Sequence, residues 1–75
     1  MAREKVPTDT QDRNAWIMYQ LRLKKSSFTI IARQHGVTAQ TVRRATLLKY
    51  PKWDHVIADT IGYEPAEIWP ERYAA

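Results

Sequence analysis

Apolar residues recur along this chain at the spacing of helices and not at the spacing of strands. Trp16, Ile17 and Leu21 fall on one face of a helical segment, and the apolar residues between Trp53 and Ile61 recur in the same way. No segment of useful length alternates apolar and polar residues, as a half-buried strand would. The pattern predicts an all-α fold, a small bundle of four to five helices.

The chain has 75 residues and no cysteine, so its stability must come from packing. A domain usually needs roughly 100 residues or somewhat fewer, which leaves room here for one. Without cysteine there is no disulfide and no thiolate metal site. We expect a flexible N-terminal arm over residues 1–11 and a folded domain over residues 12–75.

The longest apolar runs are far shorter than the ~20 residues that span a bilayer. The first 13 residues, MAREKVPTDTQDR, are polar and lack the apolar stretch of a signal peptide. We therefore expect a cytoplasmic protein without a membrane partner.

Capping residues predict where the first helices begin and end. Asp12 is a plausible N-cap for a helix that continues to Lys25. Ser26 and Ser27 interrupt this helix and offer a new N-cap for a second, short helix over residues 28–35.

Proline and glycine mark the later boundaries. Pro51 separates a third helix, ending near Leu48, from a fourth helix that Gly62 closes. Pro65 fits the first position of a last short helix, since its missing N–H is not needed there, and Pro70 ends that helix.

Positive charge is concentrated in one part of the chain. The net charge is +4, but no acidic residue occurs between Arg13 and Trp53. The bases in that stretch are Arg13, Arg22, Lys24, Lys25, Arg33, Arg43, Arg44, Lys49 and Lys52. From Asp54 onward acids prevail, which predicts one positive face that would attract phosphate. The alternative is a merely solvated basic surface.

Residues 28–47, FTIIARQHGVTAQTVRRATL, have the spacing of a helix-turn-helix. Ala32 is small enough for the third helix to cross the second closely, and Gly36 supplies a left-handed turn. Thr38 is a good N-cap for the third helix, and Val42 anchors that helix in the core. Such a motif presents a recognition helix, here about residues 38–48, to the major groove of DNA. The alternative is an ordinary helical hairpin with a glycine turn.

With Val42 facing inward, Gln40 and Arg44 lie on the opposite side of the third helix, flanked by Thr41 and Arg43. Arginine pairs well with guanine and glutamine with adenine, so these residues are candidates to read bases. We expect a second group to contact phosphates: Lys24, Lys25, Ser27, Thr29, Arg33 and Lys49. Leu47 and Leu48 would also point partly outward, so either the helix stops there, or Leu47 contacts a thymine methyl or a neighbouring part of the protein.

Several short motifs resemble the Ner regulators of transposing phages related to Mu, and their bacterial Nlp relatives. The landmarks are Arg33-Gln34-His35-Gly36, Pro51-Lys52, Ile57-Ala58 and, most specific, Ile68-Trp69-Pro70-Glu71-Arg72-Tyr73. The similarity runs from about Trp16 to Tyr73, nearly the whole chain.

The resemblance implies a λ-repressor-like DNA-binding domain and a regulator of transcription, typically one that silences early phage promoters. It also implies that Thr38 joins Gln40, Thr41, Arg43 and Arg44 on the recognition helix. Members of the family tend to have small or amide residues in place of the two arginines, which leaves the operator sequence open. Trp53 likewise replaces a residue that is often small.

Residue types that carry catalysis or bind metals are scarce. The only histidines, His35 and His55, are not spaced as a helical ligand pair, and a zinc site needs three or four ligands. Asp54 and Asp59 lie near His55 without an evident nucleophile. With only two glycines the chain has no glycine-rich phosphate loop. We expect no enzyme activity, no cofactor, no metal and no small-molecule ligand.

Other functions remain as alternatives to double-stranded DNA binding. A small helical protein-interaction module could use the acidic C-terminal half or an aromatic contact of Trp53, Trp69 and Tyr73, unless these residues only close the core. Single-stranded RNA binding usually needs exposed aromatic platforms, which the basic stretch lacks. We also expect weak self-association, with pairing mainly on DNA through residues 68–75 and the N-terminal arm.

Overall fold

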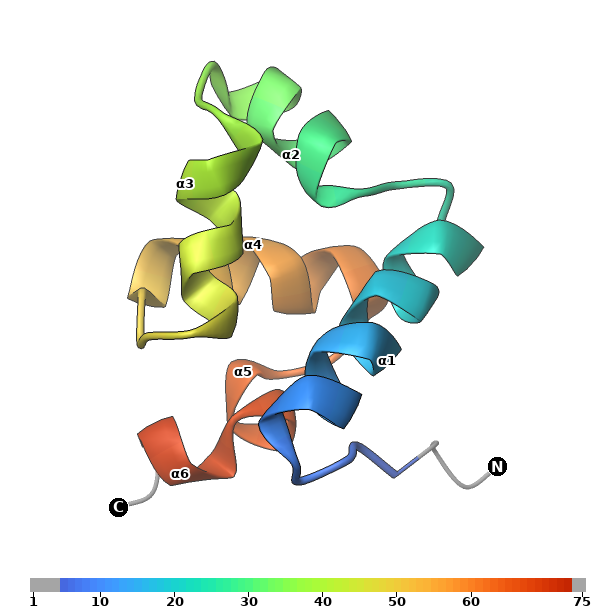
Figure 1. The fold of residues 1–75 in the computed structure, drawn as a ribbon, viewed down its shortest axis with the longest axis vertical. Coiled ribbons are helices and arrows are strands. Elements are labelled where there is room, and N and C mark those ends of the chain that lie inside the picture. The colour runs from blue at the N-terminus through green and yellow to red at the C-terminus, as the bar shows by residue number, and fades with distance from the viewer. Residues whose placement is uncertain (1–4, 74–75) are drawn as a thin grey trace.

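The computed structural model describes residues 5–73, which form helices joined by short turns (Figure 1). In chain order these are α1 (Thr10–Leu23), α2 (Phe28–His35), α3 (Ala39–Arg43), the 3-10 turn η1 (Arg44–Thr46), α4 (Pro51–Ile61), α5 (Pro65–Ile68) and α6 (Pro70–Tyr73). Residues 5–73 contain no strand, and the predicted all-α fold is confirmed.

The core lies where the helices meet around α4, which crosses the middle of the molecule (Figure 1). Both α1 and α5 contact α4, while α2 and α3 pack against each other. Ile17 of α1, Val42 of α3 and Ile57 of α4 are completely buried. Trp53 and Trp69 are buried as well, so these two residues close the core and do not form an exposed aromatic contact.

Three helices end in the same left-handed turn. Gly36 after α2 and Gly62 after α4 have φ angles of 69° and 80°, a conformation that glycine adopts without a steric penalty. Lys25 takes the same position after α1, with a φ of 56°. There the N–H of Ser26 donates to the carbonyl of Leu21 at 2.8 Å, which satisfies one of the last carbonyls of α1.

The first helix begins earlier than predicted. Asp9, and not Asp12, caps α1, because its Oδ2 accepts a hydrogen bond from the N–H of Asp12 at 3.2 Å. Asp12 lies in the first turn, where its negative charge complements the helix dipole. Thr10 and Gln11, predicted in the flexible arm, are therefore helical. Residues 1–4 of that arm lie outside the described residues.

Two boundaries in the second half of the chain also differ from the prediction. The α-helical part of the third helix ends at Arg43, and a 3-10 turn continues only to Thr46. The Thr46 hydroxyl donates to the carbonyl of Arg43 at 2.6 Å and thereby occupies an acceptor that a longer helix would use. Pro70 follows α5 but also begins α6, since its fixed φ suits a first helical position.

Candidate nucleic-acid interface

The helices α2 and α3, with the turn between them, form the predicted helix-turn-helix. Ser27 caps α2 and Thr38 caps α3, each through its hydroxyl oxygen. Val42 and Ala45 are completely buried, so the inner face of α3 and η1 is fixed against the core. The opposite face of this recognition helix is therefore turned to solvent.

Four of the five predicted base-reading residues are exposed. These are Thr38, Gln40, Arg43 and Arg44, whereas Thr41 is partly buried. The Thr41 and Thr38 hydroxyl oxygens lie 3.0 Å apart and share a hydrogen bond. The side chains of Gln40 and Arg44 have no hydrogen bond or ion pair within residues 5–73, so both can bind a ligand without losing an internal contact.

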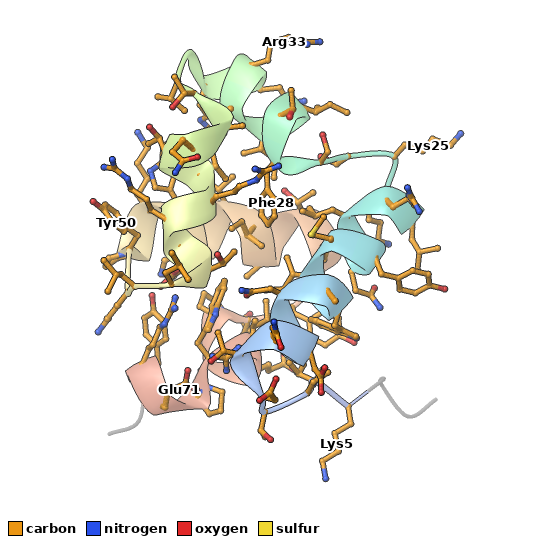
Figure 2. All side chains as sticks on the ribbon, in the orientation of Figure 1. Lys5, Lys25, Phe28, Arg33, Tyr50 and Glu71 are labelled. Atoms are coloured by element: carbon orange, nitrogen blue, oxygen red, sulfur yellow. The ribbon has the colours of Figure 1, made fainter. Side chains whose placement is uncertain are left out.

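Arg43 lines a groove of about 400 Å³ where α1, the start of α2 and α3 come together. Ser27 and Thr29 line the same groove, and so does Arg22 from α1. Phe28 points from the start of α2 toward the centre of the molecule (Figure 2). The groove thus brings two arginines to the beginning of α2, where free amides favour an anion.

Arg22 is absent from the phosphate group predicted from the sequence. Two sequence signals could have identified Arg22. It lies in the acid-free stretch, and it precedes Lys25 by one helical turn. Its approach to Arg43 could not be found from the sequence, because that approach depends on the angle between α1 and α3.

The predicted phosphate-contacting residues are spread around α2. Thr29 lies exposed in the first turn of α2, and Lys24 is exposed where α1 ends. Lys25 and Arg33 project away from the body of the protein, one before α2 and one near its end (Figure 2). This arrangement offers cations along a length of surface, as a phosphate backbone requires.

Lys49 lies apart from the other predicted phosphate contacts. Its Nζ is 4.8 Å from the centroid of the Tyr73 ring, a cation–π contact with the C-terminal helix. Lys52 makes a similar contact at 4.8 Å with the ring of Trp53. Each of these two lysines is held against an aromatic ring, Lys49 on α6 and Lys52 on α4.

Arg13 does not contribute to the basic face. It is buried, and its guanidinium donates to both carboxylate oxygens of Glu71, at 3.1 and 2.7 Å, and to the carbonyl of Ile68 at 3.1 Å. The hydrogen bond from Arg13 is the main reason why the pKa of Glu71 is lowered. The exposed basic surface therefore begins at Arg22, and Arg13 instead attaches the C-terminal segment to α1.

Leu47 and Leu48 follow η1 and are 72% and 63% exposed. The helical segment stops at Thr46, as one of the sequence alternatives proposed. Their exposure also shows that neither leucine is packed into the core. Two large, exposed apolar side chains thus lie directly after the end of the recognition helix.

Within residues 5–73, no helix is both long enough and apolar enough to cross a membrane. In the same part of the chain, no three His, Cys, Asp or Glu residues are grouped so that they could hold a metal ion.

Comparison with known families gives a match over residues 13–75 to the winged helix-turn-helix DNA-binding family. The chain belongs to this family. The match includes the whole helix-turn-helix and the C-terminal segment. Residues 5–73 contain no strand, so the wing in the name of the winged helix-turn-helix family has no β-hairpin counterpart in this part of the chain.

Individual relatives come from phages and from bacteria. The chain is 36% identical over 67 residues to a negative regulator of transcription from Escherichia phage D108, which covers 88% of this chain and 92% of the relative. A negative regulator of transcription from Escherichia phage Mu is 34% identical over 55 residues, covering 73% of each chain. The resemblance to regulators of Mu-related phages is confirmed.

A bacterial relative is longer. Sugar fermentation stimulation protein B from Escherichia coli K12 is 35% identical over 57 residues, which cover 76% of this chain and 62% of the relative. The similarity therefore spans less than two thirds of that protein.

Proposed function

We propose that this protein is a sequence-specific regulator that binds double-stranded DNA and represses transcription, with α3 and η1 in the major groove. The groove is about 12 Å wide and admits a helix. One observation carries the proposal: Gln40 and Arg44 are exposed and unpaired on a helix whose other face is anchored by Val42 and Ala45. The relatives named as negative regulators of transcription support repression. We further propose that the protein acts at the early promoters of a phage or prophage, in the bacterial cytoplasm.

We assign base reading to Gln40 and Arg44, with Thr38 and Thr41 beside them. We assign Arg43 to the phosphate backbone, because it lines the groove at the start of α2 and not the outer face of α3. The remaining phosphate contacts are Arg22, Lys24, Lys25, Ser27, Thr29 and Arg33. Lys49 is the least favourable of the predicted contacts, since its ammonium group lies over Tyr73.

The experiment is selection from a random pool of DNA duplexes by the purified protein, followed by band shifts at two salt concentrations. We expect an enriched sequence. Affinity should fall as the salt concentration rises, because protein binding releases salt cations that are condensed on the DNA phosphates. Gln40→Ala should reduce preference at one position of the enriched sequence. If binding is salt-dependent but no sequence is enriched, the protein coats DNA without reading it.

The aromatic contact expected for a protein-interaction module is largely buried within the chain. Trp53 and Trp69 are buried, and the carboxylates of Asp54 and Glu71 are paired with arginines. Asp59, Glu64 and Glu67 remain exposed, but the two tryptophans of the expected aromatic contact are not available to a partner, which favours the DNA-binding proposal.

We also propose that two copies pair on DNA. A single recognition helix reads few base pairs, too few to select one site in a genome. Ile68 and Trp69, in the segment first expected to mediate pairing, are completely buried, and residues 74–75 of that segment lie outside the described residues. The exposed Leu47 and Leu48 are better placed for contact with a second copy.

The charges around this leucine pair explain why pairing would depend on DNA. Arg44 and Lys49 flank Leu47 and Leu48, so two copies repel each other at this surface in free solution. Two leucines also cover far less than the roughly 800 Å² per partner that a stable complex buries. The negative potential of bound DNA offsets this repulsion, and adjacent binding sites bring two copies together, where a small apolar contact is sufficient.

A further inference from the structure

An arginine of the C-terminal helix α6 contacts the end of the recognition helix. Arg72 Nη1 donates to the carbonyl of Ala45 at 2.6 Å and to Oδ1 of Asp54 at 3.1 Å. The Tyr73 hydroxyl donates to the other carboxylate oxygen, Oδ2, of Asp54 at 2.7 Å. Asp54 is completely buried, so Arg72 is held between a fixed carboxylate on α4 and the backbone of η1.

The last carbonyls of a helix lack partners within the helix, so other donors must satisfy them. The carbonyl of Arg43 accepts from Thr46, and that of Arg44 accepts from the amides of Leu47 and Leu48. For the carbonyl of Ala45, Arg72 is the hydrogen-bond donor. The positive charge of Arg72 also complements the negative end of the helix dipole.

The recognition helix is too short to hold its own orientation. Its α-helical part has 5 residues and η1 has 3, whereas isolated helices shorter than about 12–15 residues are marginal in water. Packing of Val42 and Ala45 fixes its depth in the core. A further contact at the C-terminal end limits its rotation and tilt.

We propose that Arg72 is a positioning residue for base reading: through the Ala45 carbonyl it sets the direction of the Arg44 side chain, one residue earlier. The proposal rests on the proposed function, since it explains how that function becomes sequence-specific. It also gives the C-terminal Trp-Pro-Glu-Arg-Tyr motif a task in DNA recognition, although no residue of the motif belongs to the basic face.

The neighbouring residue provides a matched control. Glu71 lies in the same helix and is also paired with a buried arginine, but its partner Arg13 belongs to α1. A change at Glu71 should therefore loosen the C-terminal segment without a direct effect on the recognition helix. Arg72→Gln and Glu71→Gln differ in which of the two attachments they remove.

The first measurement is amide hydrogen exchange, which needs no DNA. In Arg72→Gln, the amides of Leu47 and Leu48 should exchange at least tenfold faster than in the wild type, while the amides of α1 should be little changed. In Glu71→Gln the two leucine amides should keep their wild-type rates. Equal exchange at the two leucines in Arg72→Gln and the wild type would overturn the proposal.

The second measurement is discrimination between the selected DNA sequence and the same duplex with the Arg44-contacted base pair changed. A good arginine contact gives roughly tenfold discrimination or more. At a temperature where each variant is fully folded, Arg72→Gln should lose most of this ratio and retain wild-type affinity for random DNA. Glu71→Gln should retain the ratio, and a folded Arg72→Gln that also retains it would overturn the proposal.

Arg72→Gln leaves the buried Asp54 carboxylate without its cation and could fail to fold. The double variant Asp54→Asn/Arg72→Gln removes both charges and serves as the second form of the test, with the same two expected results. If the wild type selects no DNA sequence, the proposed function fails while hydrogen exchange still decides the role of Arg72.

Discussion

Arg43 and Arg44 are consecutive in the chain, yet only Arg43 lines the groove at the start of α2. Arg44, at the first residue of η1, is exposed outside that groove. The two arginines therefore lie on different parts of the surface, and in the proposed complex they would meet different parts of the duplex. A phosphate contact fixes the position of the protein on DNA, and a base contact provides specificity.

Alanine substitutions should separate the roles of Arg43 and Arg44. Arg44→Ala should relax preference at one base pair, at a cost of about 1–3 kcal/mol for a good bidentate contact. Arg43→Ala should weaken binding to all sequences about equally and reduce the slope of log affinity against log salt by about 1. Selection from a random pool and salt titrations measure both effects. The assignment is wrong if Arg43→Ala changes the selected sequence and Arg44→Ala does not.

Lys25 should show a conflict between fold stability and DNA binding. Its φ of 56° is costly for a residue with a side chain, by about 1–2 kcal/mol, whereas glycine is unstrained there. Lys25→Gly should therefore raise the free energy of unfolding by up to about 1 kcal/mol, after allowance for the greater flexibility of glycine in the unfolded chain. The same substitution should weaken DNA binding, because a phosphate contact is lost.

Denaturant unfolding and band shifts on one preparation test both halves of the Lys25 prediction. Lys25→Arg keeps the charge and the strained backbone, so it should match the wild type in stability and in affinity. Unchanged affinity and unchanged salt dependence in Lys25→Gly would show that Lys25 does not contact DNA.

Gly36 should tolerate only those replacement residues that can adopt its left-handed backbone conformation. A Cβ added at Gly36 has no heavy atom within 4 Å, so the cost of substitution comes from its φ of 69° and not from crowding. Gly36→Val should lower the free energy of unfolding by about 1–2 kcal/mol or more, because a β-branched residue is poorly suited to this conformation. Gly36→Asn should lose less, since asparagine adopts it more readily. Similar melting temperatures for Gly36→Val and the wild type would contradict the requirement for this turn.

The parts of the fold that depend on near neighbours could be predicted from the sequence. Ser27, Gly36 and Thr38 act within three or four residues, so their capping and turn roles follow from local chemistry. Asp9 and Asp12 compete for one cap, and the local sequence contains no feature that separates them. The pairing of Arg13 with Glu71, 58 residues away, and of Arg72 with Ala45, 27 residues away, depends on the packed arrangement of the helices. The candidate site divides in the same way, since exposure of Gln40 follows from helical phase while the position of Arg43 in a groove does not.

The free energy of unfolding should fall in alkaline solution because the Tyr73 hydroxyl loses its proton. Burial, and next the hydrogen bond to Asp54, raise the pKa of Tyr73 to about 12 from its ordinary value of 10. The unfolded chain therefore loses this proton first, so the contribution of Tyr73 is fully present below pH 10 and is lost as pH rises toward about 12. Urea unfolding of the wild type and of Tyr73→Phe between pH 9 and about 12 isolates this contribution. The difference in unfolding free energy between them should shrink across that interval, and a constant difference would contradict the origin assigned to it.

Leu47 and Leu48 should affect how copies pair on DNA and not how one copy binds. In the pairing proposal, a second copy on the adjacent half-site covers these two side chains, which are 72% and 63% exposed in the single copy. The double variant Leu47→Ser/Leu48→Ser should therefore bind a single half-site with wild-type affinity but lose cooperativity on two half-sites about one helical turn apart. If Leu47 instead contacts a thymine methyl, the variant loses affinity already on the single half-site. Analytical ultracentrifugation should show a monomer without DNA for both proteins, and a tight wild-type dimer in free solution would show that charge repulsion does not control pairing.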